Sequence, residues 1–539
     1  MQPFLARLRR GEIGAAAVLV GGGVLLSRVL GIIRDIVFAS MLGADGVTDV
    51  YVAAFRIPDF ANYLLAGGFL AITFIPIMAR YLADDDEPGA WQAFTAITRW
   101  LAVAITGLIA VAWFATPAVI NALYPSFDDA QIASTISLTR IVLPAQFAFV
   151  VGALFTAVQY AKGRFGIPTL APIVYNVGII VGGVVWAAVT GTADPSGFIW
   201  GALVGAFVGN LGIQVFGAFR AGLRIDWSTA WKHPAVLIYI TIALPLMLGQ
   251  SIVALDETFM SIFGAQVGDG VATQLQFARR TMFVPIGVIG QAAAVAAYPT
   301  LARLFAEGDR PGLLSTVDRS MRWVVALSIG AAGVAVAMAT PIMRLLFERG
   351  AFTAESTDAA ASALAVYALA IPVWGVLQIV TRAFYARRQM WTPVIVGTGA
   401  TVVAIPLYWV LADRFGIEGV ALASVISLTL FTITLCAIWY RPTDTRAGMR
   451  SVVRSAGRTI PLVVPAAILA GLVGWFIVAG LTGPAWVAAA FALALGGLIY
   501  GAVAVGIGGW LYDFLWARAG GRVADAAPDD TTGEVQLGG

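Results

Sequence analysis

Five arginines lie inside apolar stretches of this sequence, where a positive charge is costly. Arg28 and Arg34 lie in the first long apolar stretch, Arg56 in the second, and Arg279 and Arg280 far downstream. A guanidinium at the centre of a bilayer costs about 2.5–3.5 kcal/mol on insertion scales, so such residues pair with other groups or line a water-filled cavity. A guanidinium also presents a planar fork of N–H donors that matches phosphate oxygens. These residues therefore predict the binding of an anionic, phosphate-bearing ligand at membrane depth.

Acidic residues lie close to these arginines and leave alternatives open. Asp35 is seven positions after Arg28, nearly two helical turns, so the two share one helix face, whereas Arg34 points about 120° away. Arg28 therefore either binds phosphate or forms an Arg–Asp pair that holds helices together, and Arg34 has the same choice with its neighbour Asp35. Asp256 and Glu257 interrupt a later apolar stretch. They could bind a coupling cation or carry a proton, but neutralising the two downstream arginines is the favoured interpretation.

The remaining arginines are harder to assign. Arg56 lies just before Pro58, in a stretch also interrupted at Gly67, and such residues free backbone groups and permit bending. Arg56 either lines a cavity or stabilises the packing of helices near one membrane interface. Arg279 and Arg280 are adjacent, so they cannot both face one cavity. We expect one to line it and the other to contact another helix or extend to the interface.

The composition places these charges in a membrane protein. The chain has 539 residues, of which 60% are hydrophobic and only 12% charged, compared with about 25% charged residues in soluble domains. Its mean hydropathy is +0.87. The apolar runs are long enough to cross a ~30 Å hydrocarbon core, which takes about 20 helical residues. The predicted fold class is therefore all-α, a polytopic membrane protein with about fourteen transmembrane helices, at residues 14–41, 47–81, 92–119, 131–161, 166–190, 197–219, 234–263, 270–302, 323–345, 358–386, 391–412, 417–439, 459–481 and 484–515.

The chain also contains an internal repeat. Sequence Tyr160-Ala161-Lys162 recurs 225 positions later as Tyr385-Ala386-Arg387, and at an offset of 223 Arg56, Pro76 and Arg80 match Arg279, Pro299 and Arg303. The period covers six spans, so we predict two six-helix lobes in parallel repeat plus two C-terminal helices, with a binding site near the midplane between the lobes. The expected parts are a cytoplasmic N-terminus (1–13), an N-lobe (14–225), a C-lobe (226–440), a basic cytoplasmic loop (441–458), two further spans (459–516) and a disordered cytoplasmic tail (517–539).

Loop charges predict the orientation, and missing motifs argue against catalysis. Lys and Arg are concentrated in the loops on the side of the N-terminus, which the positive-inside rule places in the cytoplasm. An even number of spans then returns the C-terminus to the same side. With one cysteine, Cys436, and one histidine, His233, the sequence argues against an intramolecular disulfide, a zinc site and a Ser–His triad. There is no Walker A sequence, so we expect a transporter rather than an enzyme or ATPase, with no nucleic-acid partner.

Several motifs resemble a known family. Ser27-Arg28-Val29-Leu30-Gly31 through Arg34-Asp35, Thr48-Asp49 and Ala54-Phe55-Arg56-Ile57-Pro58 resemble the opening of the MurJ/MviN family. That family comprises the lipid II flippases of bacterial peptidoglycan synthesis, within the multidrug/oligosaccharidyl-lipid/polysaccharide exporter superfamily. The resemblance covers residues about 14 to 440 and continues through Leu143-Pro144-Ala145-Gln146, Tyr175-Asn176, Leu345 to Phe352 and Arg382-Ala383-Phe384-Tyr385-Ala386.

The resemblance implies roles for some positions and marks departures at others. Arg28, Arg34 and Arg280 match arginines implicated in binding the lipid II diphosphate, and Asp35 and Asp49 match acidic positions of the same motif. Asn62 and Gly67 replace an arginine and a glutamate of well-studied members, and Arg279 and Phe283 replace acidic residues. Some members resemble sodium-coupled transporters with ligands in spans seven, eleven and twelve. Asp256 could match the first ligand, but span eleven has no Asn or Asp in its apolar part, so we expect no cofactor, with Na⁺ or H⁺ coupling as the alternative.

These observations predict a flippase that carries lipid II from the cytoplasmic to the outer leaflet by alternating access, with cavity arginines binding the diphosphate. The alternatives are an exporter of another polyprenyl-diphosphate glycan, or a non-transporting membrane scaffold of cell-wall synthesis. We expect a multi-pass protein of the bacterial plasma (inner) membrane with both termini in the cytoplasm. Its partners would be lipid II or a similar glycan lipid, membrane lipids and cell-wall synthesis proteins. The expected substrate-binding residues are Arg28, Arg34, Arg280, Arg56 and Asn62, and the expected charge partners or ion-coupling residues are Asp35, Asp49, Asp256 and Glu257.

Overall fold

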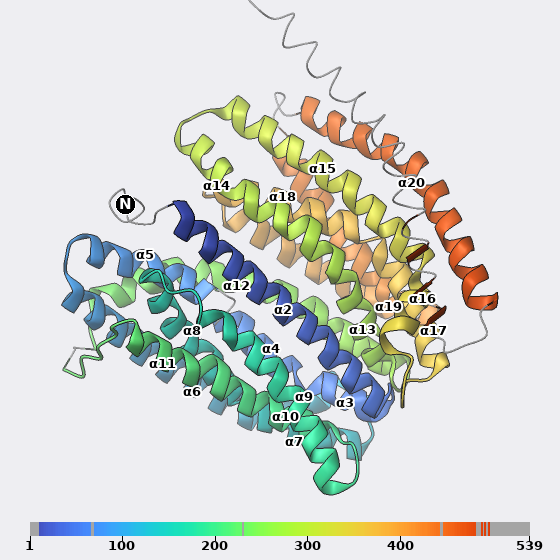
Figure 1. The fold of residues 1–539 in the computed structure, drawn as a ribbon, viewed down its shortest axis with the longest axis horizontal. Helices are drawn as coiled ribbons and strands as arrows, with labels where there is room; N and C mark the ends of the chain where they lie inside the picture. The colour runs from blue at the N-terminus through green and yellow to red at the C-terminus, as the bar shows by residue number, and fades with distance from the viewer. Residues whose placement is uncertain are drawn as a thin grey trace, which may run out of the picture.

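A computed structural model describes residues 10–65, 69–228, 231–441 and 446–480, with a few residues between 487 and 498, and its regular elements in these ranges are all helices (Figure 1). We call α2–α11 the first half and α12–α19 the second half. The first half contains α2 (Arg10–Leu42), α3 (Gly46–Ala54), α4 (Arg56–Leu65), α5 (Phe69–Ala83), α6 (Glu87–Leu123), α7 (Asp129–Val142), α8 (Ala145–Ala161), η1 (Pro168–Leu170), α9 (Ala171–Thr190), α10 (Pro195–Gly205), η2 (Ala206–Gly212) and α11 (Ile213–Arg220). The second half contains α12 (Pro234–Val267), α13 (Val271–Ile286), η3 (Gly287–Gln291), α14 (Ala292–Ala306), α15 (Arg310–Ala337), α16 (Ala339–Phe347), α17 (Ala354–Ala368), α18 (Ile371–Ala386) and α19 (Trp391–Trp439), followed by α20 (Arg446–Gly480).

The all-helical membrane fold predicted from the sequence is confirmed. In the described part of the chain, six helices are long and apolar enough to cross a membrane, or seven if the bent pair α17–α18 is one span. The first thirteen expected spans each coincide with a helix or a run of consecutive helices. The fourteenth, residues 484–515, lies largely outside the described residues, so the count of fourteen stays a prediction. The two spans expected at 391–412 and 417–439 are two helices that meet at a kink at Gly416, where φ is 57° and ψ is −131°; both carry the label α19.

The second expected span, residues 47–81, is not a single helix. It consists of α3, α4 and α5, and a turn at Phe55 separates the first two. Pro58 has no backbone N–H, and its ring would clash with the carbonyl of the residue four positions earlier in a continuous helix. The chain therefore bends directly before Arg56. The interruption expected around Gly67 lies outside the described residues.

Local structure agrees with the internal repeat at two equivalent turns. The carboxylate of Asp86 caps α6 by accepting a hydrogen bond from Gly89 N at 2.9 Å. Asp309 lies 223 positions after Asp86 and caps α15 in the same way, accepting a hydrogen bond from Gly312 N at 2.9 Å. Equivalent positions in the two halves therefore begin equivalent helices.

A second pair of equivalent turns lies at the ends of α8 and α18. Lys162 follows α8, and its ammonium lies 5.2 Å from the centre of the Trp91 ring. Arg387, 225 positions later, follows α18 and lies 5.2 Å from the centre of the Trp439 ring. Each cation contacts an aromatic ring, but Trp91 lies on α6 and Trp439 on α19, so the two rings are not at equivalent positions. The lobe boundaries at residues 225 and 440 stay predictions.

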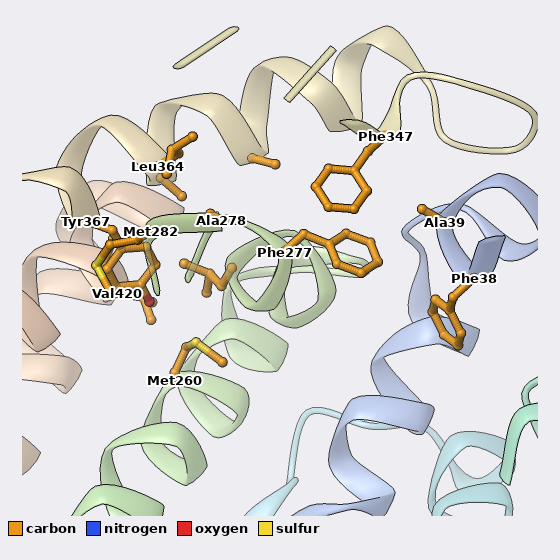
Figure 2. Close-up of a cluster of buried hydrophobic side chains, with 14 of the residues drawn as sticks. Phe38, Ala39, Met260, Phe277, Ala278, Met282, Phe347, Leu364, Tyr367 and Val420 are labelled. Atoms are coloured by element: carbon orange, nitrogen blue, oxygen red, sulfur yellow. The ribbon is translucent and has the colours of Figure 1, made fainter. Parts of the chain in front are cut away.

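Buried side chains form one core mainly in each half and one shared core. One cluster takes its residues from 74–243, including Ala235, Tyr239 and Ala243 at the start of α12, and another takes its residues from 294–452. A larger cluster joins both halves, as Figure 2 shows: Phe277 on α13 lies between Phe347 on α16 and Phe38 on α2, at ring distances of 4.6 and 6.4 Å. The shared cluster lies toward the ends of α2, α3, α16 and α17, which meet at one end of the molecule (Figure 1). We call this the closed end, and the loop charges predict that it faces outward.

The first of the two expected C-terminal spans, residues 459–481, lies in α20. α20 packs along α15 on the outside of the second half (Figure 1). It therefore takes no part in the contact between the halves.

Candidate functional site

One carboxylate joins arginines from both halves of the molecule. Asp35, on α2, is buried and accepts hydrogen bonds from Arg34 Nε at 3.1 Å and Nη2 at 2.9 Å. The same oxygen accepts a hydrogen bond from Nη1 of Arg280 on α13. Arg34 also donates to Asn176 Oδ1 on α9 at 3.0 Å. Two guanidiniums share one carboxylate, so the group carries one net positive charge and can attract an anion.

This group borders a narrow pocket beneath the closed end. Arg34 lies eight residues before the end of α2 at Leu42, or roughly 12 Å at 1.5 Å per residue. The charges therefore lie well inside the helical bundle rather than at its surface. The pocket is lined by Arg34, Asp35, Phe38, Tyr51, Val52, Thr273, Gln276, Phe277 and Arg280.

Arg28 does not pair with Asp35, although the two share a helix face. Its Nη2 donates to Oε1 of Gln291 at 2.6 Å, across from α2 to η3 in the second half. Its guanidinium lies directly against Gly287, the first residue of η3: a Cβ at that position would be 1.8 Å from Arg28 Nη1. The alternative of an Arg28–Asp35 pair is therefore not what this structure contains. The contact of Gln291 with Arg28 could not be read from the sequence.

Arg56 has two acidic partners. Its Nη2 lies 3.4 Å from Asp59 Oδ2 and its Nη1 lies 3.5 Å from Glu257 Oε2 on α12. Its Nε donates to the carbonyl of Val52 at 3.0 Å. Glu257 therefore neutralises an arginine of the second span rather than of the eighth. Asp59 was missed in the sequence, although its spacing of three residues from Arg56 is a usual spacing for a helical ion pair.

Arg279 belongs to a separate network inside the second half. Its Nη1 donates to Asp256 Oδ2 on α12 at 2.5 Å. The same carboxylate accepts hydrogen bonds from Tyr408 Oη at 2.8 Å and Ser424 Oγ at 3.1 Å, both on α19. Phe283, which stands at one of the departures from the family, lies 5.5 Å from the Arg279 guanidinium. The favoured interpretation of Asp256, neutralisation of a downstream arginine, agrees with this geometry.

Asp49 has a different kind of partner. It lies on α3, is buried, and its carboxylate accepts hydrogen bonds from Gly270 N at 2.8 Å, Thr273 N at 2.8 Å and Thr273 Oγ1 at 2.7 Å. The two N–H donors belong to the start of α13, where N–H groups lack partners within the helix and the helix dipole favours a negative charge. Asp49 therefore fastens the first half to the second at the closed end, and its contacts are with backbone and hydroxyl groups rather than with an arginine.

Asn62 is set apart from these groups. It lies half-buried on α4. Among the described side chains it makes no hydrogen bond with the arginines predicted to bind substrate, so the geometry gives it no defined part in the site.

Comparisons with known proteins agree with one another. The family described as "Lipid II flippase MurJ" matches residues 38–495. The chain is 27% identical over 501 residues to the "Probable lipid II flippase MurJ" of Vibrio cholerae, covering 90% of this chain and 93% of that protein. It is 29% identical over 507 residues to the protein of the same name from Rhizobium meliloti, with 91% and 93% covered.

Solved structures extend the comparison to the fold. "Lipid II flippase MurJ, inward closed conformation" superposes with a TM-score of 0.73 at 19% identity, covering 92% of this chain and all of that one. "Inward-facing conformation of a multidrug resistance MATE family transporter of the MOP superfamily" has a TM-score of 0.63 at 16% identity, with 79% and 95% covered. At these identities the likeness concerns the fold alone.

Proposed function

The chain belongs to the lipid II flippase MurJ family, and from that premise we propose that its arginines bind the diphosphate of lipid II while alternating access carries the headgroup from the cytoplasmic to the outer leaflet. A member of this family is a membrane transporter and not an enzyme. The proposal concerns what this chain's own residues do: which groups bind the anion, which hold the halves together, and which are merely neutralised.

The observation that carries the proposal is the Arg34–Asp35–Arg280 group. Its two guanidiniums come from opposite halves and are only half neutralised. A diphosphate could take over the donors of Arg280, whose side chain is 39% exposed, while Arg34 keeps Asp35 in place. Guanidiniums bind phosphate oxygens through paired, charge-assisted hydrogen bonds. Because the donors come from both halves, affinity would fall when the halves separate at this level, and transport requires such a difference between states.

Packing supports a direction for the cycle. The halves are joined at the closed end by the shared core and by Asp49. Toward the other end the start of α12 packs into the core of the first half, whereas the rest of the second half has a core of its own. If the closed end faces outward, the arginines are reached from the cytoplasm in this state. The headgroup would enter there, the polyprenyl tail would remain in lipid, and release outside would require opening of the Asp49 contacts.

The other charged groups are proposed to be structural or neutralised. Arg279, Tyr408 and Ser424 already satisfy the Asp256 carboxylate. We infer that a guanidinium takes the place that a coupling cation would need there, so transport would proceed without Na⁺ at Asp256 and without a cofactor. A test is flipping in proteoliposomes with choline in place of Na⁺, where an unchanged rate is expected and a large loss would contradict the inference.

The protein is a multi-pass protein of the bacterial inner membrane. We further propose that both termini are cytoplasmic and that cell-wall synthesis proteins are partners. For the orientation, a cysteine introduced by Ser126→Cys should react with an impermeant reagent in intact cells, and one introduced by Ser451→Cys should not. Labelling of the second would reverse the predicted direction of transport.

The experiment that tests the function is rescue of a strain depleted of its own lipid II flippase, with exposure of the lipid II headgroup outside the cell as the readout. The native chain should restore exposure, and Arg280→Ala should not, at equal abundance in the membrane. Arg303→Ala is the matched control, because Arg303 is an exposed arginine at the end of α14. Failure of the native chain to restore exposure, despite normal insertion, would favour another polyprenyl-diphosphate glycan as the substrate.

A further inference from the structure

We propose that Gln291 is a positioning residue for Arg28: its amide oxygen holds the guanidinium across the space between the two halves, with the remaining N–H donors directed to the diphosphate. This inference rests on the proposed function and assigns a role to a residue outside the motifs that resemble the family. Gln291 ends η3, a π-helical turn between α13 and α14. Such turns insert one extra residue into a helix and are frequent at functional sites.

The contact between Arg28 and Gln291 is specific, and a contribution to the stability of the fold explains it poorly. Arg28 Nη2 and Gln291 Oε1 are 2.6 Å apart although 263 residues separate them in the chain. Both side chains are exposed, and in the hydrated cavity of the proposed function water can satisfy each of them without the other. A hydrogen bond in such a cavity adds little to folding, because water offers the same partners. Its effect is to fix one orientation of a long side chain that otherwise samples many.

Gly287 shows that the backbone of η3 is shaped around this arginine. A Cβ at position 287 would lie 1.8 Å from Nη1 and 2.8 Å from Cζ of Arg28. Any other residue would therefore push the guanidinium away from the turn. Gly287 and Gln291 lie at the two ends of the same turn, one providing space and the other an acceptor.

The chemistry of the acceptor suits a binding arginine. An amide oxygen orients a guanidinium without cancelling its charge, whereas the carboxylate of Asp35 neutralises part of the charge of Arg34 and Arg280. Arg28 thus keeps its full positive charge and at least three N–H donors that Gln291 does not use. Pre-orienting them removes part of the entropy cost of binding the anion.

The contact also depends on the state of the transporter. α2 belongs to the first half and η3 to the second, so Arg28 and Gln291 meet only while the halves are close at this depth. When the halves separate there, Arg28 loses its orientation and binds the diphosphate less tightly. Gln291 would thereby contribute to a difference in affinity between states, which transport requires.

A double-mutant cycle tests the inference with the full-length protein in nanodiscs and fluorescent lipid II as the probe. Gln291→Met keeps the length of the side chain and removes the acceptor, and should weaken binding by about threefold to tenfold. In an Arg28→Ala background the same substitution should change nothing. Gly287→Ala should likewise weaken binding only when Arg28 is present. Gln291→Glu keeps an acceptor but neutralises Arg28, so it should weaken binding more than Gln291→Met does.

The outcomes separate this inference from the proposed function. If Arg28→Ala leaves binding unchanged, the assignment of Arg28 to the diphosphate fails. If Arg28→Ala weakens binding but Gln291→Met has no effect, or has the same effect with and without Arg28, only the role of Gln291 is overturned. Melting temperatures of all variants are measured in parallel. Should Gln291→Met fail to fold, Gln291→Glu against the native chain, with and without Arg28, decides the same question.

Discussion

Arg279 and Arg280 are neighbours on α13, yet they meet different surroundings. The Arg279 side chain is 5% exposed and its carboxylate partner, Asp256, lies in the same half. The Arg280 side chain is 39% exposed and its partner, Asp35, lies in the opposite half. A buried pair within one half can persist through a rigid-body movement of the halves, whereas a pair between the halves must change. Burial and the location of the partner, rather than residue type, thus distinguish a structural arginine from one proposed to bind substrate.

The largest effect is expected from removing the carboxylate partner of the buried Arg279. Asp256→Ala would leave the Arg279 charge without its carboxylate in a low-dielectric interior, at a cost of about 3–5 kcal/mol. We expect a strong loss of folded protein in the membrane, measured by abundance and by thermal unfolding in detergent. Asp256→Ala combined with Arg279→Met should recover much of the abundance, because no unpaired charge remains. Normal abundance of Asp256→Ala alone would contradict a structural role for this pair.

The exposed neighbour should behave in the opposite way. In Arg280→Ala, Asp35 keeps Arg34 as a partner, so the protein should fold and insert normally. The loss of a charge-assisted contact with the diphosphate, about 1.5–3 kcal/mol, should lower lipid II binding by about tenfold to a hundredfold. Arg280→Lys should recover only part of it, because an ammonium lacks the planar fork. Reduced abundance with unchanged binding per folded molecule would show that Arg280, like Arg279, is structural.

The sequence predicted part of the difference between Arg279 and Arg280. Adjacency alone predicted that Arg279 and Arg280 would have different partners, since neighbouring helical residues point about 100° apart. The helical runs, and the break between the spans at 391–412 and 417–439, also followed from local pattern. These features depend on residues that are close in the chain, so period and composition were sufficient to predict them.

The pairings themselves could not be predicted. Asp35 lies 245 residues from Arg280, and Arg28 lies 263 residues from Gln291. Which pairs meet depends on how the two halves pack, and many polar residues on the same helix faces were equally plausible partners. Asp59 is the exception, because its spacing from Arg56 is a local signal that went unused. Sequence therefore indicated the participants, and the packing of the halves selected the pairs.

The Arg280–Asp35 pair joins the two halves, and Asp49 joins the same helix, α13, to the first half at the closed end. Asp49→Asn would remove the negative charge that satisfies the start of α13, and loss of a helix cap typically costs about 0.5–2 kcal/mol. Since Asp49 and α13 lie in different halves, this cost falls on the state with the closed end shut, and the opposite state should become more populated. A cysteine introduced by Ser40→Cys, beside the Ala351 N–H to Ser40 O contact of 2.9 Å, should then react faster with an impermeant reagent. An unchanged rate would mean that Asp49 does not control closure.

The smallest effect is expected at Arg56, which combines features of both neighbours. Its side chain is 7% exposed, close to the 5% of Arg279, but its acidic partners lie farther away, at 3.4 and 3.5 Å. Because Asp59 and Glu257 share one guanidinium, Asp59→Asn should lower stability by no more than about 1 kcal/mol, visible as a small shift in melting temperature. Glu257→Gln should be equally mild. The double substitution should cost more than the sum of the two, since only then does the buried guanidinium lose both carboxylates. Strict additivity would mean that contacts other than these two acids, among them the one with the Val52 carbonyl, satisfy Arg56.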